Sequence, residues 1–358
     1  MKQNYKYNFT GQNLYIGIDV HLKSWTYTII TESGFQETRN GNSSAQELYS
    51  YLCNHYEGGN YMAVYESGFS GFSTYYALEQ LGVHCMVVHA ADVPTTQGEK
   101  VKKTDKVDSV KLAKALKSGL LCGIYIHRKD DLDGRSVVRL RSTFVKELSR
   151  YRSRVKHKLY ENGVEYPESF LSSGTHWSAR FMSWLRDDVV LLSSTRESMD
   201  LLLDKVQSAR KDLLLITRKV RALSRSERYA RDFDNLVSIP GIGLVTAMTL
   251  LTEIGDIGRF KNEKQFASYL GLIPISHSSG EKQRDGEKTF RGNKQIGPML
   301  VEASWIIIRH DRAMSLDFGQ FCQRMESQKA IVKIARKLSN RIFCVLKHQT
   351  TYEYDRRV

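Results

Sequence analysis

Short apolar runs alternate with helical patterns over the first 125 residues. Runs typical of strands cover residues 14–20, 25–31, 61–65 and 84–88, and the first two are close enough to pair as a hairpin. Helices are predicted at 43–56, 70–81 and 105–117; Ser43 or Ser44 would cap the first and Thr104 the third. Strands that alternate with helices predict an α/β unit.

Two long helical patterns follow. Residues 135–158 place apolar side chains three or four apart, and residues 199–223 fill every a and d position of their heptads with apolar residues. The heptads predict a coiled coil or a long packed helix. Self-association and an intramolecular helical hairpin explain this pattern equally well.

A glycine-containing turn opens the last third of the chain. Residues 239–244 read I-P-G-I-G-L and precede an apolar helix. Gly241 and Gly243 would allow a tight turn and expose backbone N–H groups at a helix start, where a phosphate can bind without sequence being read. This is typical of a helix-hairpin-helix, and a simple turn between packed helices is the alternative. Next comes a segment predicted as a polar loop, with His277, Ser278 and Ser279.

Charge points to a polyanionic partner. The 53 lysines and arginines exceed the 39 acids, a formal charge of +14, and residues 135–158 hold nine basic residues against one acid. Phosphates beside that helix would remove the repulsion between its charges, although a merely solvated face is the ordinary explanation of such a run. Five scattered cysteines argue against disulfides and a zinc knuckle. No secretion signal or membrane-spanning run is found, so the expected location is the cytoplasm.

Four acids stand out in the α/β unit. Asp19 interrupts an apolar strand, Glu66 ends another, and Asp105 and Asp108 share the first turn of a helix. Converging carboxylates repel each other unless divalent cations such as Mg²⁺ or Mn²⁺ lie between them. Such ions promote reactions at phosphodiesters. The alternative assigns the two helix acids to dipole stabilisation and makes Glu66 a plain loop acid.

Three segments carry a family resemblance: YIGIDVHLKSW at 15–25, YESGFSG at 65–71 and KTDKVDSVKLAKAL at 103–116. Here the sequence resembles the DEDD transposases of bacterial insertion sequences. The resemblance implies a RuvC-like, RNase H-fold catalytic domain in residues 1–130, a basic helical or coiled-coil region in 131–230, and a mostly α-helical transposase domain in 231–358. It places the metal-binding acids at Asp19, Glu66, Asp105 and Asp108.

The resemblance also gives the serine segment a role. In the family, a serine just before a glycine in this segment is the nucleophile, which here is Ser279, with Ser278 as the alternative. A basic G-N block follows at residues 291–294. The family often has an arginine soon after it, where this chain has Ile296, Gly297 and Pro298, and this departure puts one phosphate contact in doubt.

These expectations combine into a serine-type DNA recombinase with Mg²⁺, or Mn²⁺, at the acids and a phosphoserine intermediate at Ser279. The resemblance further implies dimers that pair into tetramers, and a structured noncoding guide RNA that recognises donor and target DNA, in the bacterial cytoplasm at the nucleoid. Two alternatives stay open: a metal-dependent junction endonuclease that uses water, and a catalytically silent nucleic-acid-binding protein. The sequence does not give the target site or the protomer that supplies each residue.

Overall fold

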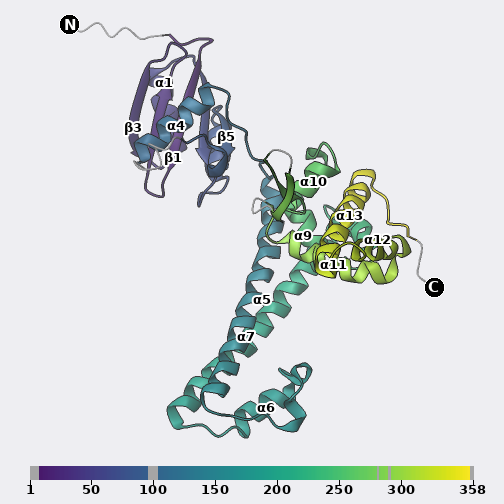
Figure 1. Cartoon of the computed structure of the whole chain (residues 1–358). Coiled ribbons are helices and arrows are strands. Elements are labelled where there is room, and N and C mark those ends of the chain that lie inside the picture. Colours follow the sequence, from purple (N-terminus) through teal and green to yellow (C-terminus); the bar gives the residue numbers. More distant parts are fainter. Residues whose placement is uncertain (1–7, 96–103, 280–281, 289–291, 355–358) are drawn as a thin grey trace. The chain divides into compact units, whose positions relative to one another are not determined.

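The computed structural model describes residues 8–95, 104–279, 282–288 and 292–354, and within 274–288 only the course of the backbone. The chain divides into two compact units, one up to Ile126 and one from His127 (Figure 1). Each unit is described by itself.

The N-terminal unit is built on a five-stranded sheet. Its strands are β1 (Asn13–Val20), β2 (Ser24–Ile30), β3 (Gln36–Asn42), β4 (Asn60–Glu66) and β5 (His84–Val88), in the order β3-β2-β1-β4-β5. β1, β2 and β3 pair antiparallel, whereas β4 runs parallel to β1 and β5 parallel to β4. The four predicted strands and the hairpin are confirmed, and this mixed α/β sheet is compatible with an RNase H-like fold.

Helices cover both faces of this sheet. On one face, α1 (Ala45–His55) and α2 (Ser73–Gln80) bury Leu48, Leu52 and Leu78 in a core with the even-numbered side chains of β1. On the other face, α4 (Asp105–Lys117) packs Leu112 and Leu116 against β4 and β5. A 3-10 turn, η1 (Ala90–Asp92), follows β5. The three predicted helices are confirmed, and Ser44 and Thr104 are the side-chain caps of α1 and α4.

Gly17 lets α4 approach β1 closely. A Cβ atom at this position would lie 2.2 Å from the carbonyl oxygen of Ser109 and 2.4 Å from the backbone nitrogen of Ala113. The hydroxyls of Thr28 and Ser109, 2.9 Å apart in the interior, tie the same helix to β2. Any side chain at Gly17 would push α4 outward. The close contact fixes the first turn of α4 beside the carboxyl end of β1.

A long helical hairpin begins the C-terminal unit. Helix α5 (Lys129–Glu161) packs along α7 (Ser193–Ser224) (Figure 1). Between them lie η2 (Glu168–Phe170), η3 (Ser173–Thr175) and α6 (Ala179–Asp187). Of these, η2 and α6 share an apolar cluster with the adjoining parts of both long helices. All eight apolar heptad positions of residues 199–223 are buried or half-buried within this one chain. The intramolecular packing therefore accounts for the heptads, and a coiled coil between copies stays a prediction.

The remaining helices share one large apolar core. They are α8 (Ala230–Val237), α9 (Leu244–Ile254), η4 (Ile257–Arg259), α10 (Glu263–Tyr269), α11 (Ile296–His310), α12 (Arg312–Cys322) and α13 (Ser327–His348). The I-P-G-I-G-L turn joins α8 to α9. Gly241 has a φ of +91°, and a Cβ there would lie 2.6 Å from the carbonyl oxygen of Ala303 on α11. This turn is therefore packed, and its phosphate-binding role stays a prediction.

The segment predicted as a polar loop is instead a two-stranded antiparallel ribbon. Strand β6 (Pro274–Ser279) pairs with β7 (Lys282–Lys288), with Ser279 opposite Lys282. The loop prediction was wrong because β7 reads KQRDGEK and shows no apolar alternation, so the strand is specified by backbone pairing that the sequence pattern does not reveal.

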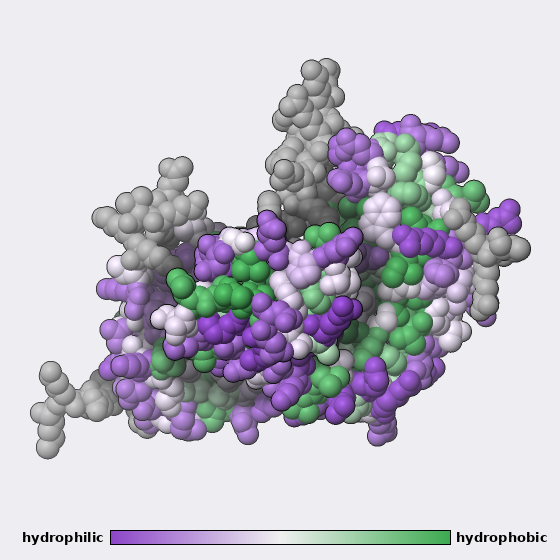
Figure 2. All heavy atoms as spheres, turned by 90° about the horizontal axis from the view of Figure 1, so that it is seen from below, coloured by the Kyte–Doolittle hydropathy of each residue, from purple (hydrophilic) through white to green (hydrophobic). Residues whose placement is uncertain are grey.

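The described surface is mixed in character. Figure 2 shows hydrophilic residues over much of one face, with hydrophobic residues in separate patches between them. No helix in the described part of the chain is both long and apolar enough to cross a membrane.

Candidate active site

Strand alternation brings Asp19 and Glu66 together. Because β1 and β4 are parallel and Ile18 lies opposite Tyr65, Asp19 and Glu66 occupy the next positions, at the carboxyl ends of neighbouring strands. Side chains of a strand alternate between faces, so both acids lie on the face that α4 covers, the face of Gly17.

The first turn of α4 supplies the other two acids. Thr104 caps this helix by accepting a 3.3 Å hydrogen bond from the backbone N–H of Val107, which places Asp105 and Asp108 at its start. All four predicted acids line one surface cavity of about 390 Å³, together with His21. The structure thus brings the four together. Glu66 is part of this cavity and not merely a loop acid.

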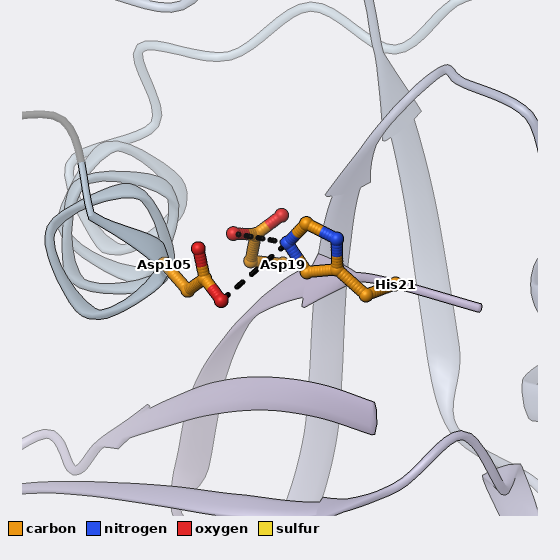
Figure 3. A group of neighbouring side chains, drawn as sticks. All are labelled: Asp19, His21 and Asp105. Atoms are coloured by element: carbon orange, nitrogen blue, oxygen red, sulfur yellow. Dashed lines mark hydrogen bonds and ion pairs between the residues drawn. The ribbon is translucent and has the colours of Figure 1, made fainter. Parts of the chain in front are cut away.

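Nitrogen-bearing side chains bridge these acids in pairs. The Lys111 ammonium lies 3.0 Å from Oδ1 of Asp108 and 3.6 Å from Oε1 of Glu66. Nε2 of His21 lies 3.3 Å from Oδ2 of Asp19 and 3.5 Å from Oδ2 of Asp105, and Figure 3 shows the ring edge directed at both carboxylates. Neither His21 nor Lys111 was predicted from the sequence as a site residue. Their signals were the spacings D-x-H at 19–21 and D-x-x-K at 108–111.

Electrostatics at the cavity favour a bound cation. Burial raises the pKa of the Asp19 carboxyl, the neighbouring His21 opposes the shift, and the charges of Asp105 and Asp108 add to it. Burial would lower the pKa of Lys111, but its hydrogen bond to Asp108 and the charges of Asp108 and Glu66 raise it. A metal-free site is therefore strained by like charges that a divalent ion would neutralise.

The donor set fits such an ion. Carboxylate oxygens are the ligands that Mg²⁺, Mn²⁺ and Ca²⁺ prefer. Asp19, His21 and Asp105 each present one ligand atom, and these atoms lie within 4.8 Å of one another. The residues present can thus hold a divalent cation without a change of fold.

A second, shallow groove adjoins this cavity. It measures about 540 Å³, shares Thr104 and Asp105 with the acid cavity, and runs over β2 and β3. Its other lining residues are Thr26, Thr38, Arg39, Asn40 and Lys106. Hydroxyl, amide and cationic groups of this kind bind phosphate oxygens of a nucleic-acid backbone.

Ser279 belongs to the C-terminal unit, whereas the four acids belong to the N-terminal one. Ser279 ends β6 and Ser278 precedes it, opposite Gln283. The side chains of both serines lie outside the described residues, as does Arg291 of the basic block. Their catalytic role stays a prediction.

A buried carboxylate holds the chain just after the β6–β7 ribbon, and it was not predicted from the sequence. Glu253, at the end of α9, is 2% exposed and receives two hydrogen bonds from Arg139 on α5, of 2.7 and 2.9 Å. It also accepts a 3.1 Å hydrogen bond from Nδ2 of Asn293, whose Oδ1 accepts from the backbone at the start of α11. A Cβ at Gly292 would collide with Gly271. The chain just before the β6–β7 ribbon and the chain just after it are thus held together. The sequence signal for Glu253 was a single acid in an otherwise apolar helix.

The basic residues of α5 divide into those bonded to neighbouring elements and those exposed without such a bond. Arg139 pairs with Glu253, and Arg141 donates a 3.1 Å hydrogen bond to Thr217 on α7. By contrast, Lys146, Arg150 and Arg154 are exposed along one side of α5. These three form an exposed row that a partner can reach.

Comparisons with known families match both halves of the chain. A model of a DEDD transposase domain of the IS110 type, described as "Transposase", matches residues 16–162, and one described as "Transposase IS116/IS110/IS902 family" matches residues 234–318. The chain belongs to the IS110/IS116 family of transposases. The first of these matches contains all four acids, and the second contains Glu253, the ribbon and Ser279.

Curated relatives of this chain cover differing shares of it. The "Putative transposase y4qE" of Sinorhizobium fredii is 28% identical over 67% of this chain, which spans only 57% of that relative's length. The "Transposase for insertion sequence element IS1533" of Leptospira borgpetersenii is 25% identical over 82% of this chain and 85% of its own. The "Pilin gene-inverting protein" of Moraxella bovis is 33% identical over 33% of this chain and 38% of its own.

Proposed function

We propose that this insertion-sequence transposase cleaves and rejoins DNA through a phosphoserine intermediate, with Mg²⁺ or Mn²⁺ at Asp19, Glu66, Asp105 and Asp108. The observation that carries the proposal is the convergence of all four acids on one cavity beside a polar groove. When bound there, a divalent ion would supply charge stabilisation at the scissile phosphate. The name of the M. bovis relative, a gene-inverting protein, supports DNA rearrangement as the outcome.

The chemistry assigned to Ser279 is a reversible transfer. Its hydroxyl oxygen attacks phosphorus, the bond from phosphorus to one deoxyribose oxygen breaks, and the proton of the hydroxyl is released as the leaving oxygen gains one. The P–O bond to serine keeps the free energy of the phosphodiester, so that a second deoxyribose hydroxyl can reverse the step and join a new strand. Basic residues of the ribbon segment would stabilise the charge on the attacked phosphate.

Partners and assembly complete the proposal. Because the acids and Ser279 belong to different units, the working site is composite and forms within one chain or between copies in a dimer or tetramer. A structured noncoding RNA supplies sequence recognition for donor and target DNA, and the exposed face of α5 contacts a nucleic-acid backbone. Residues 1–130, 131–230 and 231–358 would then serve as catalytic, nucleic-acid-binding and serine-bearing domains.

A trapping assay tests the serine step. The full chain is mixed with its RNA, Mg²⁺ and end-labelled DNA and analysed on a denaturing gel. We expect a protein–DNA adduct that disappears in Ser279→Ala and persists in Ser278→Ala, the neighbouring control on the same strand. Cleavage without an adduct in the unaltered protein would favour the junction endonuclease that uses water. Full activity in Asp19→Asn would contradict the role of the acids.

A further inference from the structure

His21 is held beside the acids by the β1–β2 hairpin. It follows Asp19 by two residues, so an extended chain directs both side chains to the same side. Its backbone N–H donates a 3.2 Å hydrogen bond to the carbonyl of Ser24, which closes the turn into β2. The backbone position of His21 is therefore set by the same hairpin that places Asp19.

The three ligand atoms have the spacing of a coordination site. Two ligands about 2.1 Å from an ion and at right angles are about 3 Å apart. Nε2 of His21 lies 3.3 Å from Oδ2 of Asp19 and 3.5 Å from Oδ2 of Asp105 (Figure 3). These distances exceed the expected spacing only slightly, so small inward movements of the three side chains would suffice to coordinate one ion. The His21 side chain is half exposed and has room for such a movement.

Lys111 distinguishes the two halves of the cavity. Its ammonium lies between Glu66 and Asp108, so that half already contains a cation of the protein. In the half formed by Asp19 and Asp105, the ring nitrogen Nε2 of His21 takes the corresponding place. A divalent ion meets less repulsion on the His21 side than beside the ammonium.

We propose that His21 is a ligand of the divalent ion that Asp19 and Asp105 hold, which makes this a mixed nitrogen and oxygen site. The inference rests on the proposed metal-binding role of the acids and adds a residue to it. The ring binds through Nε2 and keeps its proton on Nδ1. Because imidazole favours transition metals over Mg²⁺, the site discriminates for Mn²⁺ more strongly than carboxylates alone would.

Pulsed electron paramagnetic resonance of Mn²⁺ tests this directly. The full chain is loaded with Mn²⁺ at about pH 8, where an imidazole is neutral, and the spectrum is searched for the coupling of a directly bound nitrogen. We expect the coupling in the unaltered protein and its loss in His21→Ala. Mn²⁺ affinity should fall about tenfold or more in this variant, and Mg²⁺ affinity should fall less. His84→Ala is the control, since His84 begins β5 at the opposite end of the sheet.

The outcomes separate the two proposals. If Mn²⁺ binds without nitrogen coupling and Asp19→Asn abolishes the binding, the acids hold the ion and His21 is not a ligand. Equal losses of Mn²⁺ and Mg²⁺ affinity in His21→Ala, with no change in the spectrum, would likewise overturn the inference and leave a hydrogen-bonding role. If the unaltered chain binds no Mn²⁺ that depends on Asp19, both the inference and the metal-binding function fail.

Discussion

Lys111 supplies the positive charge between Glu66 and Asp108 when no metal is present. Its side chain is only 10% exposed, and its ammonium lies 3.0 Å from Asp108 and 3.6 Å from Glu66. Without the ammonium of Lys111, the carboxylates of Glu66 and Asp108 would repel each other. The lysine therefore stabilises the metal-free cavity and also lowers its attraction for a divalent ion.

Replacing Lys111 by glutamine should affect these two properties in opposite directions. The free energy of unfolding of the metal-free protein should fall by about 1–2 kcal/mol, because the two acids lose their counter-charge. Added Mg²⁺ should stabilise Lys111→Gln more than the unaltered protein, because the ammonium no longer opposes the ion. Urea unfolding with and without Mg²⁺ measures both effects. Lys114→Gln, at an exposed position on the same helix, should show neither; a matching response there would contradict a specific role of Lys111.

At the scale of elements, the sequence predicts the helices and strands whose pattern of apolar residues reflects their burial. α4 and β5 begin and end at the predicted residues, since β5 is an apolar run and Thr104 is a clear cap. β3 reads QETRNGN, lies at the sheet edge and has mostly exposed side chains, so alternation could not reveal it. Asp19 and Glu66 were found because charge in an apolar strand is anomalous, and Asp105 and Asp108 because they share the first turn of a helix. The roles of His21 and Lys111 depend on distances that only the fold creates.

The Glu253 contact links three elements and should report on their packing. Burial alone would raise the pKa of this carboxyl, but the hydrogen bond and charge of Arg139, the charge of Arg135 and the hydrogen bond of Asn293 lower it below its ordinary value. A carboxyl whose pKa is lower in the folded than in the unfolded state stabilises the fold at pH values above its unfolded-state pKa of about 4.3. This stabilisation is lost as the pH falls through the folded-state pKa. The contact should therefore stabilise the C-terminal unit at neutral pH and not in acid.

Glu253→Gln should lower the free energy of unfolding by about 2–4 kcal/mol at neutral pH, since the glutamate is buried and Arg139 is half exposed. The difference from the unaltered protein should shrink as the pH falls below about 4. Denaturant titrations across this pH range measure it. Glu302→Gln, at an exposed position on α11, should be near neutral at every pH. A difference that does not depend on pH would point to lost packing and not to the ion pair.

For the whole molecule, the formal charge of +14 overstates what a nucleic acid can contact. Arg139 is paired with Glu253, and Arg141 is bonded to Thr217, so these cations hold α5 to its neighbours. Lys146, Arg150 and Arg154 are exposed at four-residue spacing and form a continuous row. This row is the part of the basic helix that can follow a phosphate backbone.

Neutralising Arg150 and Arg154 to glutamine should therefore weaken nucleic-acid binding and flatten its salt dependence. Each phosphate contact contributes about 0.9 to the slope of log affinity against log salt for duplex DNA, and about 0.7 for single strands. Losing two contacts should therefore reduce the slope by about 1.8 when the ligand is duplex DNA and by about 1.4 when it is a single strand. Fluorescence anisotropy over a salt series measures this. Arg218→Gln with Lys219→Gln, exposed on α7, removes equal charge elsewhere; an equal change of slope there would show that net charge matters and that the row on α5 does not.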